Sequence, residues 1–326
     1  MAICAPLAGG GISLRKAMAT APWQELDSPD ALIFWATRVP RVLAALLTGG
    51  ALALAGLAYQ CVLRNPLAEP YILGVSAGAG MGKALVVLFW GSMVSILGVF
   101  SSIVFCFLGA LVPLLFLQGL ALRQRRFAPV TLLLAGVMLN VVLSAAMMLV
   151  LVFAPPDSAR QVQLWWLGSL DLVGFRQFYM TCPVVLFAAG VIVLRGRAMN
   201  VLGFDSATAA QLGLDVEREV RVLLWSATLL ASAVVALAGP IGFIGLVVPH
   251  LLRRVFGVDN RLLAPLCLFY GAAFLMLCDL IGWRGASVLG LSSTMEVPVG
   301  VVTALLGGPL FLLLLVRGTL SGEIRG

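Results

Sequence analysis

Runs of about 20 apolar residues, separated by short polar stretches, recur along this chain. The hydrocarbon core of a bilayer is about 30 Å thick, and a helix that rises about 1.5 Å per residue needs about 20 residues to cross it. The composition agrees with a lipid environment, because 61% of the 326 residues are apolar, 11% are charged and the mean hydropathy is +1.08. The sequence therefore predicts an all-α, polytopic integral membrane protein with a single transmembrane domain over residues 1–326.

The apolar runs locate the predicted helices. Clear spans are predicted at Val42–Leu63, Ser76–Trp90, Val94–Leu117, Val130–Phe153, Phe178–Leu194, Val220–Ala238, Leu262–Trp283 and Val297–Val316. A shorter apolar piece, Ile241–Leu252, is interrupted by glycines and prolines. It predicts either a short crossing or a re-entrant segment, because irregular backbone at membrane depth must find partners inside the protein. At the N-terminus, Met1–Ala8 is apolar but too short to span, and no basic stretch precedes it as a secretory signal would require.

Basic residues predict the orientation, because cytoplasmic loops carry an excess of Lys and Arg. If the short piece is a crossing, one side receives Arg64, Arg123, Arg125, Arg126, Arg195, Arg197, Arg218, Arg221, Arg253, Arg254, Arg261, Arg317 and Arg325. The other side receives Arg15, Lys16, Arg38, Arg41, Arg160, Arg176 and Arg284. The first side is predicted to be cytoplasmic. The net charge of +7 is spread over several short loops, so it indicates topology and no nucleic-acid partner.

The stretch Ala77–Ala84 superficially resembles a phosphate-binding loop. Its first position is alanine instead of glycine, and its last is alanine where the motif needs the Ser or Thr that binds Mg²⁺. Gly74, Gly78 and Gly82 instead recur every four residues, which predicts one face of a helix on which a neighbouring helix packs closely. The sequence therefore predicts no ATP site in this chain.

Charged residues inside apolar runs are costly and therefore informative. Lys83 and Asp279 are such residues, and Glu296 lies at the start of the last span, where the helix dipole would stabilise a carboxylate. These charges are isolated in the sequence, so no proton relay is predicted. His250 stands alone and the six cysteines form no C-x-x-C pair, so neither a metal site nor a catalytic residue is predicted.

The segment 199–219 is the longest polar stretch on the predicted cytoplasmic side. Asp205 or Ser206 can cap a short helix over Ala207–Leu212, Gly213 can end it, and Asp215 can start another turn. An ordered helical loop is a candidate interaction surface. The alternative is a plain connector between two spans.

Five stretches, in this order, resemble the signature segments of FecCD-type permeases, the membrane subunits of bacterial ABC importers for iron-siderophores, heme or cobalamin. They are Arg38–Arg41, Arg64–Pro70, Leu73–Gly80, Gly239–His250 and Glu296–Gly300. The resemblance covers nearly the whole chain from Arg38 onward. Between Asp279 and Glu296 the chain is several residues longer than the family pattern.

The resemblance implies about ten transmembrane helices per subunit, the first of them shortened here. It implies a homodimer in the bacterial cytoplasmic (inner) membrane, surrounded by lipid, with the transport path along the dimer axis. Two separate ATP-binding cassette subunits, which hold ATP and magnesium, would dock on the cytoplasmic side, and an extracytoplasmic substrate-binding protein would dock on the other. The chain itself would then be a transport subunit that carries no cofactor and is not an enzyme.

The resemblance also implies roles for particular residues. Arg38, Arg41 and Arg284 would receive acidic residues of the binding protein, in exposed ion pairs, and Asn65 and Leu67 would contribute to the cytoplasmic gate. The loop at 199–219 would couple to the ATPase through Asp205, Ser206, Ala207, Ala209, Ala210, Gln211, Leu212 and Gly213.

Two other classes of function remain to be compared with an importer permease. A secondary transporter driven by Na⁺ or H⁺ would use Asp279 and the broken segment near Pro240 as ion sites. An intramembrane enzyme is not supported, because the sequence shows no paired carboxylates, histidine cluster or Ser/His arrangement. The sequence predicts a permease for a metal chelate and does not name the chelate.

Overall fold

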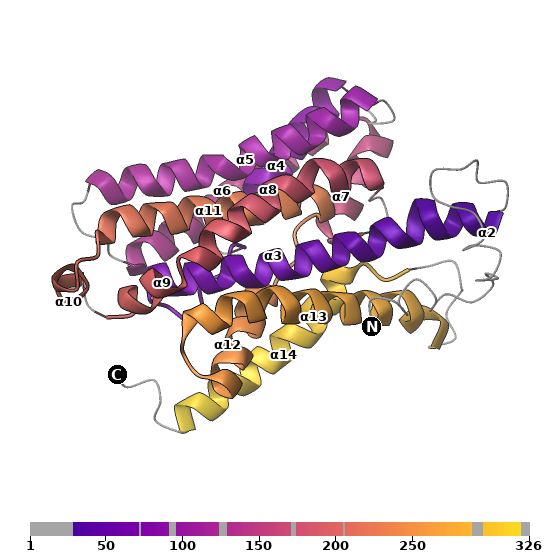
Figure 1. Ribbon diagram of the computed structural model, residues 1–326. Helices are drawn as coiled ribbons and strands as arrows, with labels where there is room; N and C mark the ends of the chain where they lie inside the picture. Colours follow the sequence, from indigo (N-terminus) through magenta and orange to yellow (C-terminus); the bar gives the residue numbers. More distant parts are fainter. Residues whose placement is uncertain are drawn as a thin grey trace.

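The computed structural model of the chain describes residues 29–71, 73–90, 96–123, 129–170, 174–204, 206–288 and 296–320. Within these ranges every regular element is a helix, and the long helices lie side by side in one elongated bundle (Figure 1). The predicted all-α membrane fold is confirmed. The segment Met1–Ala8 lies outside the described residues.

Each predicted span contains a helix. These helices are α3 (Val39–Leu63), α4 (Val75–Trp90), α5 (Ile96–Arg123), α6 (Pro129–Val152), α8 (Phe175–Leu194), α11 (Val216–Ala238), α13 (Asn260–Val288) and α14 (Val299–Leu320). In the described part of the chain, 5 helical stretches are long and apolar enough to cross a bilayer, while the apolar parts of α4, α5 and α14 are shorter. The polytopic bundle is thus confirmed, and the number of ten helices stays a prediction.

Helix α3 is the centre of the bundle. Its side chains are nearly all buried beyond its first turns, and it packs against α8, α11, α13 and the short helix α12 (Ile244–Phe256). A β-carbon on Gly49 would lie 2.3 Å from the carbonyl oxygen of Gly271 on α13, and one on Gly56 would lie 1.9 Å from that of Gly245 on α12. Such small residues let helix backbones approach closely, which is a main source of helix association in lipid.

The helix that contains α3 begins earlier than predicted. Helices α2 (Pro29–Leu32) and η2 (Ile33–Arg38), the latter a π-helical segment, lead into α3 without interruption. Pro40 lies in the first turn of α3 and has no N–H to donate to the preceding turn. A wider π turn directly before a proline accommodates that missing hydrogen bond. Arg38 and Arg41 are therefore held on one continuous helix.

Three short helices are α7 (Pro156–Trp166), α9 (Gly196–Leu202) and α10 (Ser206–Gln211). Of these three helices, the sequence predicted only α10. Helix α7 begins with Pro156 at its first position and has Asp157 in its first turn, which are the signals of a helix start. Its buried side chains, Val162 and Trp165, hold it against the bundle.

The short apolar piece near Pro240 is an interrupted element. Helix α11 ends at Ala238, residues 239–243 are not helical, and α12 leads the chain back to the end of the bundle where α9 lies (Figure 1). The irregular backbone finds a partner inside the protein, since the N–H of Phe243 donates to Oε2 of Glu69 over 3.2 Å. The chain thus reverses direction at this break, and the choice between a short crossing and a re-entrant segment stays a prediction.

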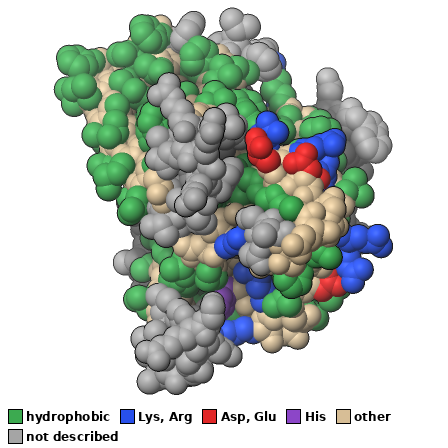
Figure 2. Space-filling view, turned by 90° about the vertical axis from the view of Figure 1, so that its left-hand side faces the viewer, with side chains coloured by type: hydrophobic (Ala, Val, Ile, Leu, Met, Phe, Trp, Pro, Cys, Tyr) green, Lys and Arg blue, Asp and Glu red, His purple; other side chains and the backbone are tan. Residues whose placement is uncertain are grey.

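Among the described residues, most of the exposed arginines lie at one end of the bundle, and Figure 2 shows basic side chains on the face at that end. On the elements that meet there these are Arg64, Arg197, Arg218, Arg221, Arg254 and Arg261. The starts of α2 and α3 and the end of α13 lie at the opposite end (Figure 1). This distribution matches the two predicted sides, and the excess of arginine makes the end with α9 and α10 the cytoplasmic one.

Candidate functional site

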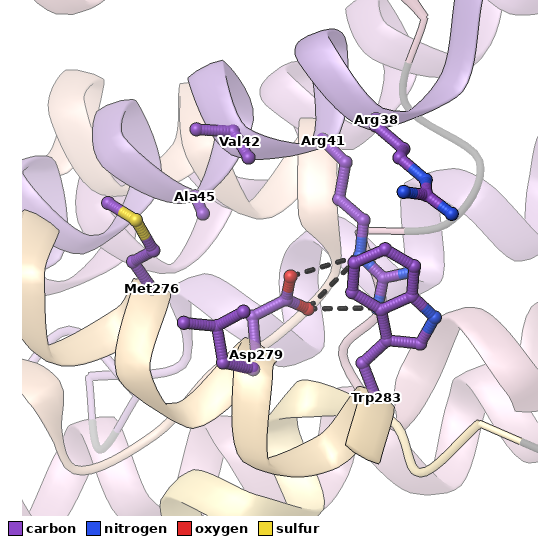
Figure 3. A pocket seen from close by; sticks show the side chains of 8 residues that line it. Arg38, Arg41, Val42, Ala45, Met276, Asp279 and Trp283 are labelled. Carbon is purple, nitrogen blue, oxygen red and sulfur yellow. Dashed lines mark hydrogen bonds and ion pairs between the residues drawn. The ribbon is translucent and has the colours of Figure 1, made fainter. Parts of the chain in front are cut away.

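A charged cluster lies at the extracytoplasmic end of the bundle. Arg38 ends η2 and Arg41 lies in the first turn of α3, while Asp279 and Trp283 lie one helical turn apart on α13. Because α13 packs along α3 and runs in the opposite direction, its second half lies beside the start of α3 (Figure 3). The two helices together position these side chains.

Arg41 binds two carboxylates from different segments. Its Nε lies 3.0 Å from Oδ2 of Asp279 and its Nη2 lies 3.0 Å from Oδ1, in a two-pronged ion pair. Its Nη1 donates to Oε2 of Glu296 over 2.6 Å. The side chains of Arg41 and Asp279 are only 13% and 9% exposed, whereas that of Glu296 is 37% exposed. The pair with Asp279 is therefore the one removed from water.

Trp283 packs against both neighbouring arginines. The guanidinium carbons of Arg38 and Arg41 lie 5.0 Å and 5.3 Å from its ring centroid, within the range of cation–π attraction. The pocket among these side chains encloses about 10 Å³, which is room for about one water molecule. The cluster is thus too small to bind a chelate. Arg284, the next residue on α13, is exposed.

Three expectations about this end of the molecule are wrong. Asp279 and Glu296 are not isolated charges, because both are bound by Arg41. Glu296 does not lie at the first residue of the last helix as expected, since α14 begins at Val299. The guanidinium of Arg41 was expected to be exposed, but it is mostly buried and already paired. The periodicity of a sequence cannot show which charges of distant helices meet.

The predicted gate residues lie in the 64–74 connection between α3 and α4. Helix α3 ends at Arg64, which has a left-handed backbone with φ of 46°. The side-chain oxygen of Asn65 accepts from the N–H of Leu67 over 2.8 Å, and its carbonyl accepts from Ala68 over 3.1 Å. Leu67 is 38% exposed. The connection is therefore an ordered turn with Leu67 at its exposed tip.

Glu69, to which the sequence alone assigns no role, is the buried acid of this connection. It is 7% exposed, and its Oε2 accepts from the backbone N–H of Phe243 over 3.2 Å. Burial raises the pKa of Glu69 to about 7, while the hydrogen bond from Phe243 acts in the opposite direction. The available signal was a glutamate between Ala68 and Pro70, directly before an apolar run.

The cytoplasmic loop contains the expected short helix, shifted by one residue. Helix α10 ends in a Schellman motif, in which the N–H of Leu214 donates to the carbonyl of Ala209 and that of Gly213 donates to the carbonyl of Ala210. Gly213 has φ of 82°, which agrees with the predicted glycine stop. The carboxylate of Asp215 caps α11 by accepting from the N–H of Arg218 over 3.1 Å.

Some predicted loop residues are described only in part. Asp205 lies outside the described residues. Of Ser206 and Ala207 the structure describes only their place in α10. Ala209 is buried, whereas Ala210, Gln211 and Leu212 are exposed on this end of the molecule.

Helix α9 ties the loop to the bundle. The side chain of Asn200 donates to Oδ1 of Asp259 over 2.7 Å and accepts from the N–H of Asn260 over 2.7 Å, at the start of α13. The Nε of Arg64 donates to the carbonyl of Leu202 over 3.1 Å. The loop is thus attached to α13 and to the end of α3.

The three predicted packing glycines all face α5, although only two of them lie on α4; a β-carbon on Gly74 would lie 3.2 Å from Cβ of Pro113. Gly78 and Gly82 lie on α4, and β-carbons there would lie 2.2 Å from the carbonyl oxygen of Gly109 and 2.0 Å from that of Phe105, both on α5. Gly74 precedes α4 and has φ of 84°. Gly74 lies where the chain turns into the helix, and glycine adopts a positive φ more readily than other residues.

The chain matches the model of the FecCD transport family over residues 2–317. The uncharacterised ABC transporter permease protein YvrB of Bacillus subtilis is 37% identical over 289 residues, which cover 88% of this chain and 79% of that protein. The vitamin B12 import system permease protein BtuC of Vibrio cholerae is 39% identical over 300 residues, which cover 91% and 86%.

One solved structure has the same fold from end to end. It is described as an inward-facing conformation of a metal-chelate type ABC transporter, and it aligns with a TM-score of 0.80 and 26% sequence identity. The alignment covers 97% of this chain and 96% of that chain. The likeness therefore includes both ends of the bundle.

Proposed function

The chain belongs to the FecCD transport family, as an ABC importer permease of the bacterial inner membrane, and from this premise we propose that its cargo is a metal chelate. The candidates are a ferric siderophore, heme and cobalamin. Cobalamin comes first because relatives named as vitamin B12 permeases match along most of the chain. The match over residues 2–317 is the observation that carries the proposal.

An ion-driven secondary transporter has no comparable support. Its ion site would need the carboxylate of Asp279 to be open to Na⁺ or H⁺. That carboxylate is instead bound by the guanidinium of Arg41 through two hydrogen-bonding nitrogens. The proposed driving force is therefore ATP hydrolysis, on partner subunits that hold the ATP and magnesium, because Ala77–Ala84 lacks two required positions of a phosphate-binding loop.

The proposed assembly contains two copies of this chain, two ATPase subunits and one extracytoplasmic binding protein. Apolar side chains on α6 support a face toward a second copy or lipid, since Val137, Met138, Val141 and Val142 are exposed in the single chain. At the cytoplasmic end, the folded α9–α10 loop supports a role in docking and coupling to the ATPase. Asn65 and Leu67 remain the proposed gate residues.

The proposed docking surface for an acidic binding protein contains Arg38, Arg41 and Arg284. The three arginines are not equivalent. Arg284 is exposed and Arg38 is stacked on Trp283, whereas the charge of Arg41 is already balanced by its own carboxylates. We therefore expect reversal of charge at Arg284 to weaken docking directly, and to make docking less dependent on salt, because exposed ion pairs are screened.

Uptake in a strain that lacks this gene tests the proposal. Ferric siderophore, heme and cobalamin are offered separately, and the gene is restored on a plasmid. We expect restored uptake of one chelate, first of all cobalamin, and co-purification of the chain with a separate ATPase. ATP hydrolysis by the isolated chain, or uptake that collapses with the ion gradient while ATP is maintained, would contradict the proposal.

A further inference from the structure

The connection between α3 and α4 contacts two other parts of the molecule. At its start, Nε of Arg64 donates to the carbonyl of Leu202, the last residue of α9. At its middle, the carboxylate of Glu69 accepts from the N–H of Phe243, in the break between α11 and α12. Asn65 fixes the turn between these two contacts. Six residues thus join the cytoplasmic loop to the interrupted helix.

Phe243 has an unusual backbone for its residue type. Its φ of 70° and ψ of −22° are left-handed, a region that is unfavourable for a residue with a bulky side chain. Such a conformation persists only where the surroundings hold it in place. Its carbonyl accepts from the N–H groups of Leu246 and Val247, and so begins α12.

The side chain of Phe243 meets α14 where that helix has no side chains. A β-carbon on Gly307 would lie 2.4 Å from Cβ and 2.8 Å from Cγ of Phe243. The aromatic side chain therefore packs directly on the backbone of α14. When the backbone of Phe243 moves, either the phenyl ring must rotate to another position or α14 must move with it. Packed contacts of this kind transmit displacement because they leave no free space.

The buried carboxylate of Glu69 has one clear function in this arrangement. In the described part of the chain no cationic side chain pairs with it, and its Oε2 accepts from the N–H of Phe243. Burial of a polar group costs free energy unless the group is hydrogen-bonded, so the bond from Phe243 offsets part of the cost of burying Glu69.

We propose that Glu69 is a positioning residue that links movement of α9 to α14, through the turn at Asn65 and the left-handed Phe243. The inference rests on the proposed function, because it assumes that α9 follows the ATPase and that the turn is part of the gate. In this arrangement Glu69 keeps the gate turn and α14 in a fixed position relative to each other. Opening of the turn would then require α12 and α14 to move with it.

Three variants test this link in the assembled complex. Glu69→Gln keeps an oxygen that can accept from Phe243, whereas Glu69→Leu removes the acceptor at similar volume. Phe243→Gly relieves the left-handed backbone but removes the aromatic contact to Gly307, so it probes the same link without a buried cavity at Glu69. Each variant is reconstituted with the ATPase and the binding protein, and uptake and ATP hydrolysis are measured in the same vesicles.

We expect Glu69→Leu and Phe243→Gly each to lower chelate uptake per ATP by about tenfold, while hydrolysis and the amount of folded complex change little. Glu69→Gln should keep the wild-type ratio. The double variant should be no worse than either single variant, because both break the same link. Parallel loss of uptake and hydrolysis, additive effects of the two variants, or failure of Glu69→Gln to rescue would overturn the proposal.

A second measurement separates this inference from the choice of cargo. Leu67→Cys, in a chain with the native cysteines replaced, carries a spin label at the tip of the turn in both copies. We expect ATP to change the distance between the two labels in the wild-type background and not with Glu69→Leu. An unchanged response with Glu69→Leu would refute the link, whereas wild-type vesicles that take up none of the three chelates would refute only the proposed cargo.

Discussion

Replacement of Asp279 by leucine should be among the most destabilising changes at the extracytoplasmic end. The ion pair with Arg41 uses two nitrogens at 3.0 Å, and the two side chains are 13% and 9% exposed. Removing one partner of a fully buried pair costs about 3–5 kcal/mol, and the lower end of that range is expected here because Arg41 keeps its contact with the more exposed Glu296. Glu296 contacts the same guanidinium but is 37% exposed, so Glu296→Gln should cost about 1 kcal/mol or less.

A double variant separates loss of the pair from loss of packing. In Arg41→Met/Asp279→Leu both charges are replaced by apolar groups, and such replacements are often neutral or stabilising. The double variant should therefore recover most of the stability that Asp279→Leu alone loses. The free energy of unfolding is measured by circular dichroism of the purified chain during titration of detergent micelles with SDS.

Salt provides an independent control on the same proteins. The contribution of the exposed Glu296 should decrease as salt is added, while that of the buried Asp279 should change little. The reasoning is refuted if Asp279→Leu and Glu296→Gln cost the same, or if the double variant costs the sum of its two single changes. Either result would mean that the pair is not desolvated in the folded protein.

Three further outcomes are expected. Gly213→Val forces a branched residue to φ of 82° and should lower uptake per ATP while the spans stay folded, and Gly213→Asn should have a milder effect. If both variants keep the wild-type uptake per ATP, the loop is a plain connector. Gly78→Ala should cost about 1–3 kcal/mol of unfolding free energy, because its β-carbon would lie 2.2 Å from a carbonyl oxygen of α5, whereas Gly190→Ala, which meets nothing within 4 Å, should cost none. In the folded protein the pKa of Glu69, whose titratable neighbour is Tyr71, is raised from 4.5 to about 7, so its favourable contribution to the free energy of unfolding is present below pH 4.5 and is lost as pH rises through about 7. The stability of the wild type relative to Glu69→Gln should therefore fall between about pH 5 and pH 8. A difference that does not change with pH would contradict this.

The sequence alone determined the class of fold and most helix positions. Lipid allows few ways to satisfy backbone hydrogen bonds, so an apolar run such as Val130–Phe153 predicts a helix almost without regard to its neighbours. The glycine stop at Gly213 and the cap at Asp215 were also predictable, because capping depends on residues close in sequence. The same local signals were present at Pro156, where the short helix was missed.

The tertiary structure alone decided which charges and glycines meet. Asp279 and Glu296 read as isolated, yet both bind Arg41, 238 and 255 positions away in the chain. Gly74 continues the spacing of Gly78 and Gly82, but it falls outside the helix. Glu69 gained a role only when the fold placed the N–H of Phe243 beside it. Helical periodicity reports which residues share a face, whereas the partner of that face depends on how whole helices pack, and that information is not local in the sequence.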